Sequence, residues 1–415
     1  MIVLAMDNAE GETHYYGLPE SQGFAMMFVR VDILADLGIE IPQTWDDIMA
    51  AIPKLQAKNM QMGLTTDNTI HLYQMGGELF ADNGMRIDLD SQIGLASFQK
   101  TCDLFTKYGF PYQYDGANRF RTGEMPIIIA DYTGLYNQLK VFATEIEGSW
   151  VMVPVPGVAA LDENGDQAYD ANGNKIINNS AIAAVTASVI VKGCEGKMMD
   201  SAWEYIKWFT GEDCQAEYSN EMVALLGPSA KYNTANRHAL ERLPWTNEEL
   251  QRIKAQFDSL AAVPNYPGAY IISRYTGFAF LAAYNDKEDP QQAIRSHITA
   301  INKEITRKRA EFGLETLEQG QTLADKRFDQ ACAAAEELAQ RDAKYNSLRD
   351  DVVYASKTND SAYIKGVAEG IMAMTQKDNT LIISKGPDIT KLNEKQLLYY
   401  IYVALTDAAN ALLTY

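Results

Sequence analysis

Residues 15–38 read YYGLPESQGFAMMFVRVDILADLG, and residues 42–47 follow as PQTWDD. Gly17 and Pro19 predict a chain reversal. The apolar run at residues 24–29 comes next and has the length of a buried strand. Gly38 ends the short helix that follows, because glycine tolerates the left-handed backbone dihedrals of a helix end. The stretch therefore predicts a turn, a buried strand and a short helix in succession.

A second helix is predicted to begin at Trp45. Thr44 lies three residues before Asp47, so its hydroxyl can accept a hydrogen bond from a free amide of the first helical turn. The Asp47 carboxylate is placed at the positive end of the helix dipole. This pair predicts a capped helix that extends to residue 58.

This string resembles the pattern YGLPxxxxxxxxFYRKDILxxLGxxxPxTWDD of carbohydrate-type solute-binding proteins of ABC transporters, the maltodextrin-binding-like group. Val29 departs from the pattern, because the family usually has Tyr there. The resemblance covers residues 15–314 and implies an α/β, two-lobed periplasmic-binding-protein-like fold. In that family the segment carries the first hinge crossing between the lobes.

The resemblance also implies how the chain is divided. Family members carry a signal peptide and much of a first lobe before the hinge; neither is visible here, so we expect the first lobe to be incomplete. The location implied is extracytoplasmic, at the cell surface or in the periplasm. The expected parts are a first-lobe remnant and hinge at 1–36, mainly the second α/β lobe with the return crossing at 37–260, a late cleft segment with closing helices at 261–314, and a C-terminal α-helical module at 315–415.

Length and charge narrow the classes of partner. A chain of 415 residues exceeds what one hydrophobic core usually serves, so two or three domains are expected. Its 36 basic and 55 acidic residues give a formal net charge of −19, which argues against nucleic acid because phosphate backbones attract positive charge. No apolar run approaches the roughly 20 residues that span a bilayer. The family resemblance accordingly implies membrane contact only through a permease or a lipid anchor absent from this chain.

No metal or cofactor is expected. The four cysteines are scattered without metal-ligand spacing; Cys194 and Cys214 could pair, but ordinary thiols are favoured. The acidic, Asn-Gly-containing segments 162–166 and 170–174 invite a calcium interpretation, yet they lack the downstream acidic ligand of a calcium loop. Asn-Gly turns in an exposed hairpin fit them better.

The strongest site prediction from the residues alone follows the apolar run 126–130. Asp131 and Tyr132 stand where this buried strand ends. In open α/β sheets ligands bind beyond the carboxyl ends of the strands, so we expect these side chains to face a ligand. The family resemblance implies the same for Tyr132, as a ring that stacks on a sugar.

Further ligand-binding residues are expected on other segments. A Pro-Gly loop precedes Tyr270 and Arg274, and such a pair suits a polyhydroxylated ligand because the ring stacks on sugar C–H faces and the guanidinium donates to hydroxyls. The alternative is a surface ring and an ion-paired arginine. The hinge and a loop of mixed polar and aromatic residues supply the other candidates, Glu20, Gln22, Phe24 and Tyr73.

Two helical regions complete the predictions. Residues 197–210 predict a helix in which Trp203, Tyr205, Trp208 and Phe209 pack in a core, since aromatics at helical spacing are usually core residues. Beyond the family-like part, helices are expected at 316–356, 361–376 and 393–413, in a module whose role the sequence does not reveal.

The sequence favours a binding protein over an enzyme. It has no nucleophile elbow, His-Glu-x-x-His, phosphate loop or dinucleotide fingerprint, and its four histidines are isolated from one another. The leading interpretation is a non-catalytic carbohydrate receptor that closes about a hinge and delivers its ligand to an ABC permease. The alternatives are a glycosidase-like enzyme, which needs two cleft carboxylates, and an adaptor that acts through the helical module.

Overall fold

The computed structural model describes residues 5–7, 13–65, 69–160, 168–171, 173, 175–341, 343–358, 360–377, 400, 401 and 404. The chain forms two compact units, Met1–Ala81 with Ile87–Ile301 and Asp82–Arg86 with Asn302–Tyr415. The second unit begins inside helix α12 (Pro290–Glu311), whereas the sequence placed the start of the helical module at residue 315. No helix in the described part of the chain is long and apolar enough to cross a membrane.

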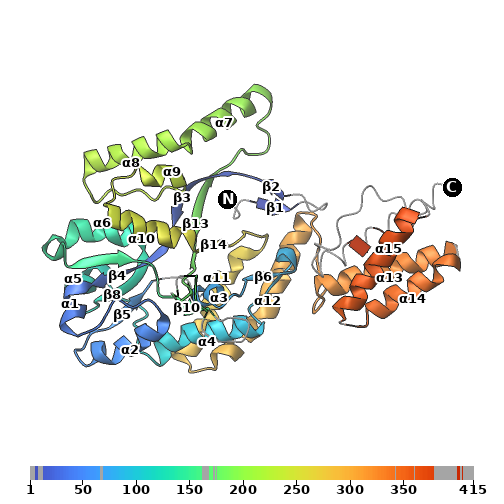
Figure 1. Cartoon of the computed structure of the whole chain (residues 1–415), viewed down its shortest axis with the longest axis horizontal. Coiled ribbons are helices and arrows are strands. Elements are labelled where there is room, and N and C mark those ends of the chain that lie inside the picture. The colour runs from blue at the N-terminus through green and yellow to red at the C-terminus, as the bar shows by residue number, and fades with distance from the viewer. Residues whose placement is uncertain are drawn as a thin grey trace. The chain divides into compact units, whose positions relative to one another are not determined.

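The first unit is built around one four-stranded sheet in the order β5-β8-β4-β9 (Figure 1). Strand β4 runs antiparallel to both of its neighbours, and β5 runs parallel to β8. The predicted buried run is confirmed, because Met26, Met27, Phe28 and Val29 are all 0% exposed. The strands are β4 (Ala25–Arg30), β5 (Met62–Leu64), β8 (Ile127–Asp131) and β9 (Trp150–Val153).

Helices cover both faces of this sheet. Alternate residues of a strand point to opposite faces, and Met27 and Val29 pack with α2 (Trp45–Gln56) while Phe28 packs with α6 (Tyr132–Phe142). The capping box predicted for the start of α2 is confirmed: Thr44 Oγ1 accepts from the Asp47 amide at 3.1 Å. The sheet is therefore the centre of a lobe with two hydrophobic layers.

The same unit contains a second, smaller sheet. Strand β3 (Leu18–Gly23) pairs antiparallel with β13 (Ala184–Ser188), with a register shift between Thr186 and Ala187. Helices α7 (Gly196–Phe209) and α8 (Glu212–Leu226) follow it in the chain. We call β3, β13, α7 and α8 the ribbon region. A single residue, Phe24, connects β3 to β4 and so joins the two sheets.

The prediction of a packed aromatic core in α7 is wrong for this structure. Ile206 is the buried residue of the helix. Trp203, Tyr205 and Trp208 are 44%, 58% and 61% exposed. The spacing correctly indicated an amphipathic helix, but within the described residues the layer that would cover most of its apolar side is absent.

The remaining elements of the first unit are short or peripheral. The strands β10 and β11 pair antiparallel beside the segments considered for calcium, most of which lie outside the described residues. All four cysteines are free thiols. The bounds are β1 Ala5–Asp7, β2 Thr13–Tyr15, α1 Val31–Asp36, α3 Ile70–Gln74, β6 Phe80–Ala81, β7 Arg86–Ile87, α4 Gln92–Thr106, α5 Gly116–Arg121, β10 Val158–Ala159, β11 Ile177–Asn178, β12 Ala181–Ile182, α9 Arg237–Glu241, α10 Asn247–Asp258, β14 Leu260–Ala261 and α11 Ile272–Asn285.

The second unit is helical, as predicted, but the first expected helix is interrupted. Its helices are α13 (Leu323–Arg341), α14 (Asn346–Ala355) and α15 (Ser361–Lys377), with a 3-10 turn at Ala343–Tyr345. They share a core that includes Leu338, Val352 and Ile371. The expected helix at 393–413 lies mostly outside the described residues.

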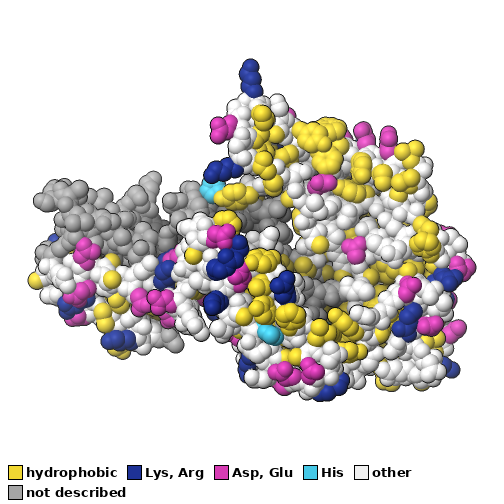
Figure 2. Space-filling view, turned by 180° about the vertical axis from the view of Figure 1, so that it is seen from behind, with side chains coloured by type: hydrophobic (Ala, Val, Ile, Leu, Met, Phe, Trp, Pro, Cys, Tyr) yellow, Lys and Arg dark blue, Asp and Glu magenta, His cyan; other side chains and the backbone are white. Residues whose placement is uncertain are grey.

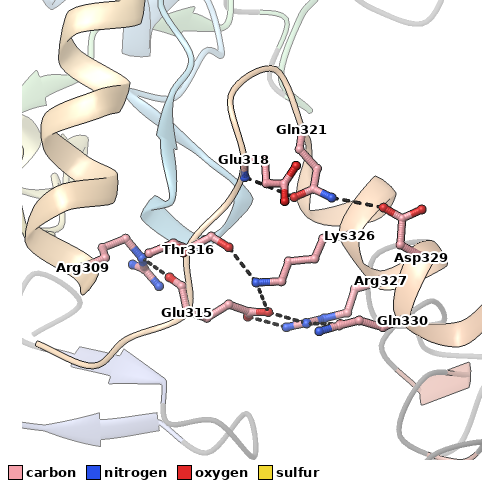
Figure 3. A network of polar contacts seen from close by, with 9 residues as sticks. All are labelled: Arg309, Glu315, Thr316, Glu318, Gln321, Lys326, Arg327, Asp329 and Gln330. Carbon is pink, nitrogen blue, oxygen red and sulfur yellow. Dashed lines mark hydrogen bonds and ion pairs between the residues drawn. The ribbon is translucent and has the colours of Figure 1, made fainter. Parts of the chain in front are cut away.

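A polar network holds the segment that leads from α12 into α13 (Figure 3). The Arg327 guanidinium donates to both carboxylate oxygens of Glu315 at 2.5 Å. Lys326 Nζ donates to the carbonyl of Thr316 at 2.6 Å, and Arg309 Nε donates to the carbonyl of Glu315 at 2.7 Å. The start of the helical module is thus attached to α12 by charged groups.

Candidate functional site

The candidate site lies at one edge of the four-stranded sheet. Since β4 is antiparallel to β8 and β9 while β5 is parallel to β8, the carboxyl ends of β5, β8 and β9 share an edge. The amino end of β4 is at the same edge, so β3 reaches the sheet there. The crossing from β3 to β4, where the sequence predicts the hinge, therefore lies at the edge beyond which ligands bind in open α/β sheets.

Asp131 is held at this edge by its own helix. Its Oδ1 accepts hydrogen bonds from the Gly134 amide at 2.7 Å and from Thr133 Oγ1 at 3.2 Å, and so caps α6. Its Oδ2 points toward the hinge, where a Cβ on Gly23 would come within 2.9 Å of it. Glycine at position 23 thus leaves room for the carboxylate, and the side chain of Asp131 remains exposed to solvent.

A return loop at residues 227–236 closes one side of the edge. The Gln22 amide donates to the Asn233 carbonyl at 2.7 Å, and the Ala235 amide donates to the Glu20 carbonyl at 3.1 Å. Asn137 of α6 holds the loop from the other side through both the amide and the carbonyl of Lys231. Residues about two hundred positions apart in the chain are thereby fixed against the hinge strand.

Tyr232 joins the candidate site from this loop. Burial, followed by the negative charge of Glu20, raises the pKa of the Tyr232 phenol to about 12. Its ring meets Tyr218 edge-on with centroids 5.2 Å apart. The sequence predicted a return crossing within residues 37–260 but did not single out this side chain. Glu20, Gln22, Asp131, Tyr232 and Asn233 together form what we call the hinge cluster.

Phe24 and Tyr132 come together beneath the edge and not on it. Their rings stack with centroids 4.3 Å apart and an interplanar angle of 15°. They are 3% and 1% exposed, and Trp245 lies 6.1 Å from Tyr132 between ring centroids. Burial also raises the pKa of the Tyr132 phenol far above its usual range. In this conformation both rings are core residues, which differs from the ligand-facing position expected of them.

Tyr73 is half-buried on α3. The next residue, Gln74, accepts from Trp45 Nε1 at 2.7 Å and donates to the carbonyls of Pro156 and Ser180. The Tyr73 carbonyl accepts from Asn178 Nδ2 at 3.1 Å. This network fixes α3 beside the segment that follows β9, one of the strands that end at the candidate edge.

Tyr270 and Arg274 lie on another element, the 3-10 turn Ala269–Ile271 and the first turn of α11. Tyr270 is 63% exposed, and Arg274 is exposed as well. Helix α11 packs on α4 through Phe280, whose ring meets Phe105 edge-on at 5.0 Å. Both side chains are thus exposed to solvent on a helix that packs on α4, which fits both the ligand-binding prediction and the surface alternative.

The buried histidine has a structural environment. His71 Nδ1 lies 2.9 Å from Thr101 Oγ1, and the ring is 4.5 Å from Trp45 between centroids. Burial, together with the positive charge of Lys100, lowers the pKa of His71 to about 3, so the ring is neutral at physiological pH. Within the described residues, no group of three or more His, Cys, Asp or Glu is placed to hold a metal ion.

Known proteins with similar structures have the two-lobed fold. An ABC transporter solute-binding protein from Thermotoga lettingae, solved with alpha-D-tagatose, matches with a TM-score of 0.54 and 19% identity, over 70% of this chain and 72% of that one. The sugar-binding protein MalE from Xanthomonas citri matches with a TM-score of 0.58 and 17% identity, over 74% and 75% of the two chains. At these identities the likeness shows the fold.

Sequence comparison points to the same group. An arabinooligosaccharide-binding protein of Halalkalibacterium halodurans is 28% identical over 134 residues, which are 27% of this chain and 30% of that relative. The match therefore spans less than a third of the relative's length. A family model described as bacterial extracellular solute-binding protein matches residues 4–238, more than half of the chain. The chain belongs to the bacterial extracellular solute-binding protein family.

Proposed function

We propose that this protein is a non-catalytic carbohydrate receptor that delivers its ligand to the permease of an ABC importer. The observation that carries the proposal is the hinge cluster, in which exposed or half-buried polar side chains gather where β3 enters the sheet and β8 ends. Lobes connected at such a crossing can close around a ligand by a hinge motion. The family is extracellular, so we infer an extracytoplasmic location.

The chemistry of the hinge cluster suits a polyhydroxylated ligand. The carboxylates of Asp131 and Glu20 accept hydrogen bonds. The side-chain amides of Gln22 and Asn233 and the Tyr232 phenol can both donate and accept. Sugar hydroxyls require this mixture of donors and acceptors. Hydrogen bonds to a charged carboxylate contribute more than neutral ones, about 1.5–3 kcal/mol each. Asp131 is therefore proposed as the main polar contact. Tyr73, Tyr270 and Arg274 are proposed as further contacts on the supporting helices.

Sugars are proposed as the ligand class because similar proteins bind sugars. The relative from Halalkalibacterium halodurans is an arabinooligosaccharide-binding protein, and the solved Thermotoga protein holds a tagatose. A binding role also explains why the residue is an aspartate. One carboxylate oxygen of Asp131 caps α6, and the other faces Gly23 at the proposed hinge. We infer from the family that the protein is not an enzyme. The permease is likewise inferred as the partner.

The test is calorimetry with arabino-oligosaccharides, maltodextrins and tagatose, followed by Asp131→Asn against the sugar that binds. Asparagine keeps an oxygen that can cap α6, so the fold is expected to melt within a few degrees of wild type. Loss of the charge is expected to weaken binding at least tenfold. Asp115→Asn is the matched control, because Asp115 caps α5 in the same way, by accepting from the Asn118 amide at 3.1 Å.

Two outcomes would count against the proposal. If no sugar in the panel binds, the receptor function fails for this chain. If a sugar binds and Asp131→Asn has no more effect than Asp115→Asn, the hinge cluster is not the binding site. Release of reducing ends from a labelled oligosaccharide would instead favour the glycosidase alternative.

A further inference from the structure

We propose that Gln215 of α8 is a positioning residue for the hinge cluster, and that it holds the return loop so that the Tyr232 phenol meets the ligand. Gln215 is 1% exposed, too deeply buried to touch a ligand itself. The inference rests on the proposed function, because it gives Gln215 a part in binding the same ligand. It adds a side chain that acts from inside the fold, through the loop at residues 227–236.

The buried side of α8 is polar, whereas a helix at the surface of a domain usually buries an apolar side. Its buried residues are Gln215, Ala216 and Ser219. Two leucines at its carboxyl end, Leu225 and Leu226, are instead 78% and 63% exposed. Figure 2 shows hydrophobic side chains gathered at the top of the first unit, where Figure 1 draws α7 and α8. Hydrogen bonds therefore carry more of the attachment of α8 than they do in an ordinary amphipathic helix.

Gln215 forms hydrogen bonds with two segments at once. Its Nε2 donates to the Phe209 carbonyl at the end of α7, at 2.8 Å, and its Oε1 accepts from Thr234 Oγ1 of the return loop, also at 2.8 Å. The two ends of an amide have opposite roles, so these contacts fix the direction in which the side chain points. Neither contact is easily given up, because a buried amide or hydroxyl without a partner destabilises the fold.

Thr234 passes this constraint to the rest of the return loop. Its side chain is fully buried, and its Oγ1 also accepts from the Asn236 amide at 3.0 Å. Asn236 in turn donates through Nδ2 to the Thr210 carbonyl, just after α7, at 3.0 Å. The Thr234 backbone forms an antiparallel bridge with Ser21 of β3. The loop is thus held between β3 and the corner that joins α7 to α8, and Gln215 lies at that corner.

Tyr232, two residues before Thr234, lies against the same part of α8. Its ring meets Tyr218 edge-on, and Tyr218 is three residues from Gln215, so both lie on one face of the helix. Burial and the charge of Glu20 raise the pKa of the Tyr232 phenol to about 12, and the Gln215 side chain beside it acts in the opposite direction. A shift of this face of α8 would therefore move the phenol relative to Glu20 of the hinge cluster.

The experiment uses Gln215→Met, which keeps the length of the side chain and removes its hydrogen bonds. Calorimetry with arabinotriose, maltotriose and D-tagatose as probes measures the affinity. Affinity is expected to fall about fivefold, the loss that one typical hydrogen bond represents. Amide hydrogen exchange is measured without sugar. Exchange at Ala235 and Asn236, whose amides donate to Glu20 and Thr234, is expected to speed up about tenfold, while exchange in β4 stays unchanged.

Ser219→Ala is the matched control. Ser219 lies one turn further along the buried side of α8 and is 0% exposed, and its hydroxyl has no hydrogen-bond partner in the described structure. The change removes a buried polar group from the same helix without breaking a contact. Affinity and loop exchange are therefore expected to stay within about twofold of wild type.

A double-mutant cycle separates positioning from general stability. Tyr232→Phe removes the phenol hydroxyl and is expected to weaken binding by itself. Because Gln215 acts through this phenol, Gln215→Met is expected to have little further effect on affinity in the Tyr232→Phe background, whereas a purely structural loss would be equal in both backgrounds. If Gln215→Met melts early, adding Thr234→Val removes the hydroxyl left unpaired. That double variant is expected to regain stability without regaining affinity.

Three results would overturn the inference. They are an affinity of Gln215→Met equal to that of Ser219→Ala, an equal loss in the Tyr232→Phe background, and unchanged exchange at Ala235 and Asn236. Asp131→Asn is measured with the same sugar, so that the two failures can be distinguished. If Asp131→Asn weakens binding and Gln215→Met does not, the positioning role fails and the proposed function stands. If the wild type binds none of the probes, the proposed function fails and the positioning role fails with it.

Discussion

The four-stranded sheet and the sheet of β3 and β13, both in the first unit, differ in how completely they are covered. The four-stranded sheet has helices on both faces, and its central strand residues are 0–1% exposed from Met26 to Val29 and from Ile127 to Ile129. The ribbon region has two strands, and its helices expose aromatic side chains. Local sequence signals are equally clear in both. The difference shows that periodicity indicates which side of an element is apolar but not whether a partner covers it.

The largest expected effect is in the covered sheet. Phe28→Ala removes a fully buried ring that packs against Trp150 at 5.8 Å between centroids and leaves a cavity between two layers. We expect it to lower the free energy of unfolding by about 3–5 kcal/mol. Trp208→Ala in the ribbon region is expected to lower it by less than about 0.5 kcal/mol. Urea denaturation measures both, and equal losses would remove the distinction between the regions.

Two tyrosines that the sequence predicted to bind the ligand sharpen the comparison. Tyr132 is buried against Phe24, so Tyr132→Ala is expected to cost about 3–5 kcal/mol of stability, as other buried aromatics do. Tyr270 is 63% exposed, and Tyr270→Ala is expected to change stability by less than about 0.5 kcal/mol. Calorimetry with the bound sugar accompanies the melts. A stable Tyr132→Ala protein with weakened binding would return that ring to the ligand site.

The junction of the helical module is an intermediate case, because the charged network of Figure 3 holds it beside a small buried apolar cluster of Met85, Leu317 and Leu323. Burial alone would raise the pKa of the Glu315 carboxyl, but hydrogen bonds and charges from Arg327 and Lys326 outweigh it and lower the pKa below 4.5. A lowered folded-state pKa stabilises the protein above the unfolded value. That contribution is present above about pH 4.5 and is lost as the pH falls through the folded pKa.

Glu315→Gln is therefore expected to cost about 1–2 kcal/mol at pH 7 and little at pH 3. It should also speed proteolytic cutting between residues 315 and 320, in the segment that leads from α12 into α13. Glu311→Gln is the control, because Glu311 makes only surface ion pairs with Arg307 and Lys308 in the part described. If the wild type is cut as rapidly as Glu315→Gln, the network of Figure 3 does not hold the segment.

Much of the fold could be predicted from the sequence because its signals are local. The buried run of β4, the strand that ends at Asp131 and the capping box of Thr44 and Asp47 each depend on a few adjacent residues. The strand-end rule also placed Asp131 correctly at the accessible edge. It could not tell that Tyr132, one residue later, turns into the core, because that depends on stacking with Phe24 from another strand.

What the sequence missed depends on long-range contacts. Tyr232 approaches Glu20 because the return loop bonds to β3 across more than two hundred residues, and no local pattern encodes that pairing. The aromatic residues of α7 were predicted to be buried because the helical pattern is that of a core helix. Whether another element covers that pattern depends on tertiary packing, and in the described structure Trp203, Tyr205 and Trp208 are exposed.

Amide hydrogen exchange on the 415-residue chain alone tests the central contrast most directly. Amides of β4 at residues 26–29 and of β8 at residues 127–130 are expected to exchange only through global unfolding, because both strands are central and buried on both faces. Amides of β13 at residues 184–188 are expected to exchange at least a hundredfold faster, through local opening of a two-stranded sheet. Equal protection of the two sheets would contradict the account, because it would show that the two-stranded sheet is held as firmly as the four-stranded one.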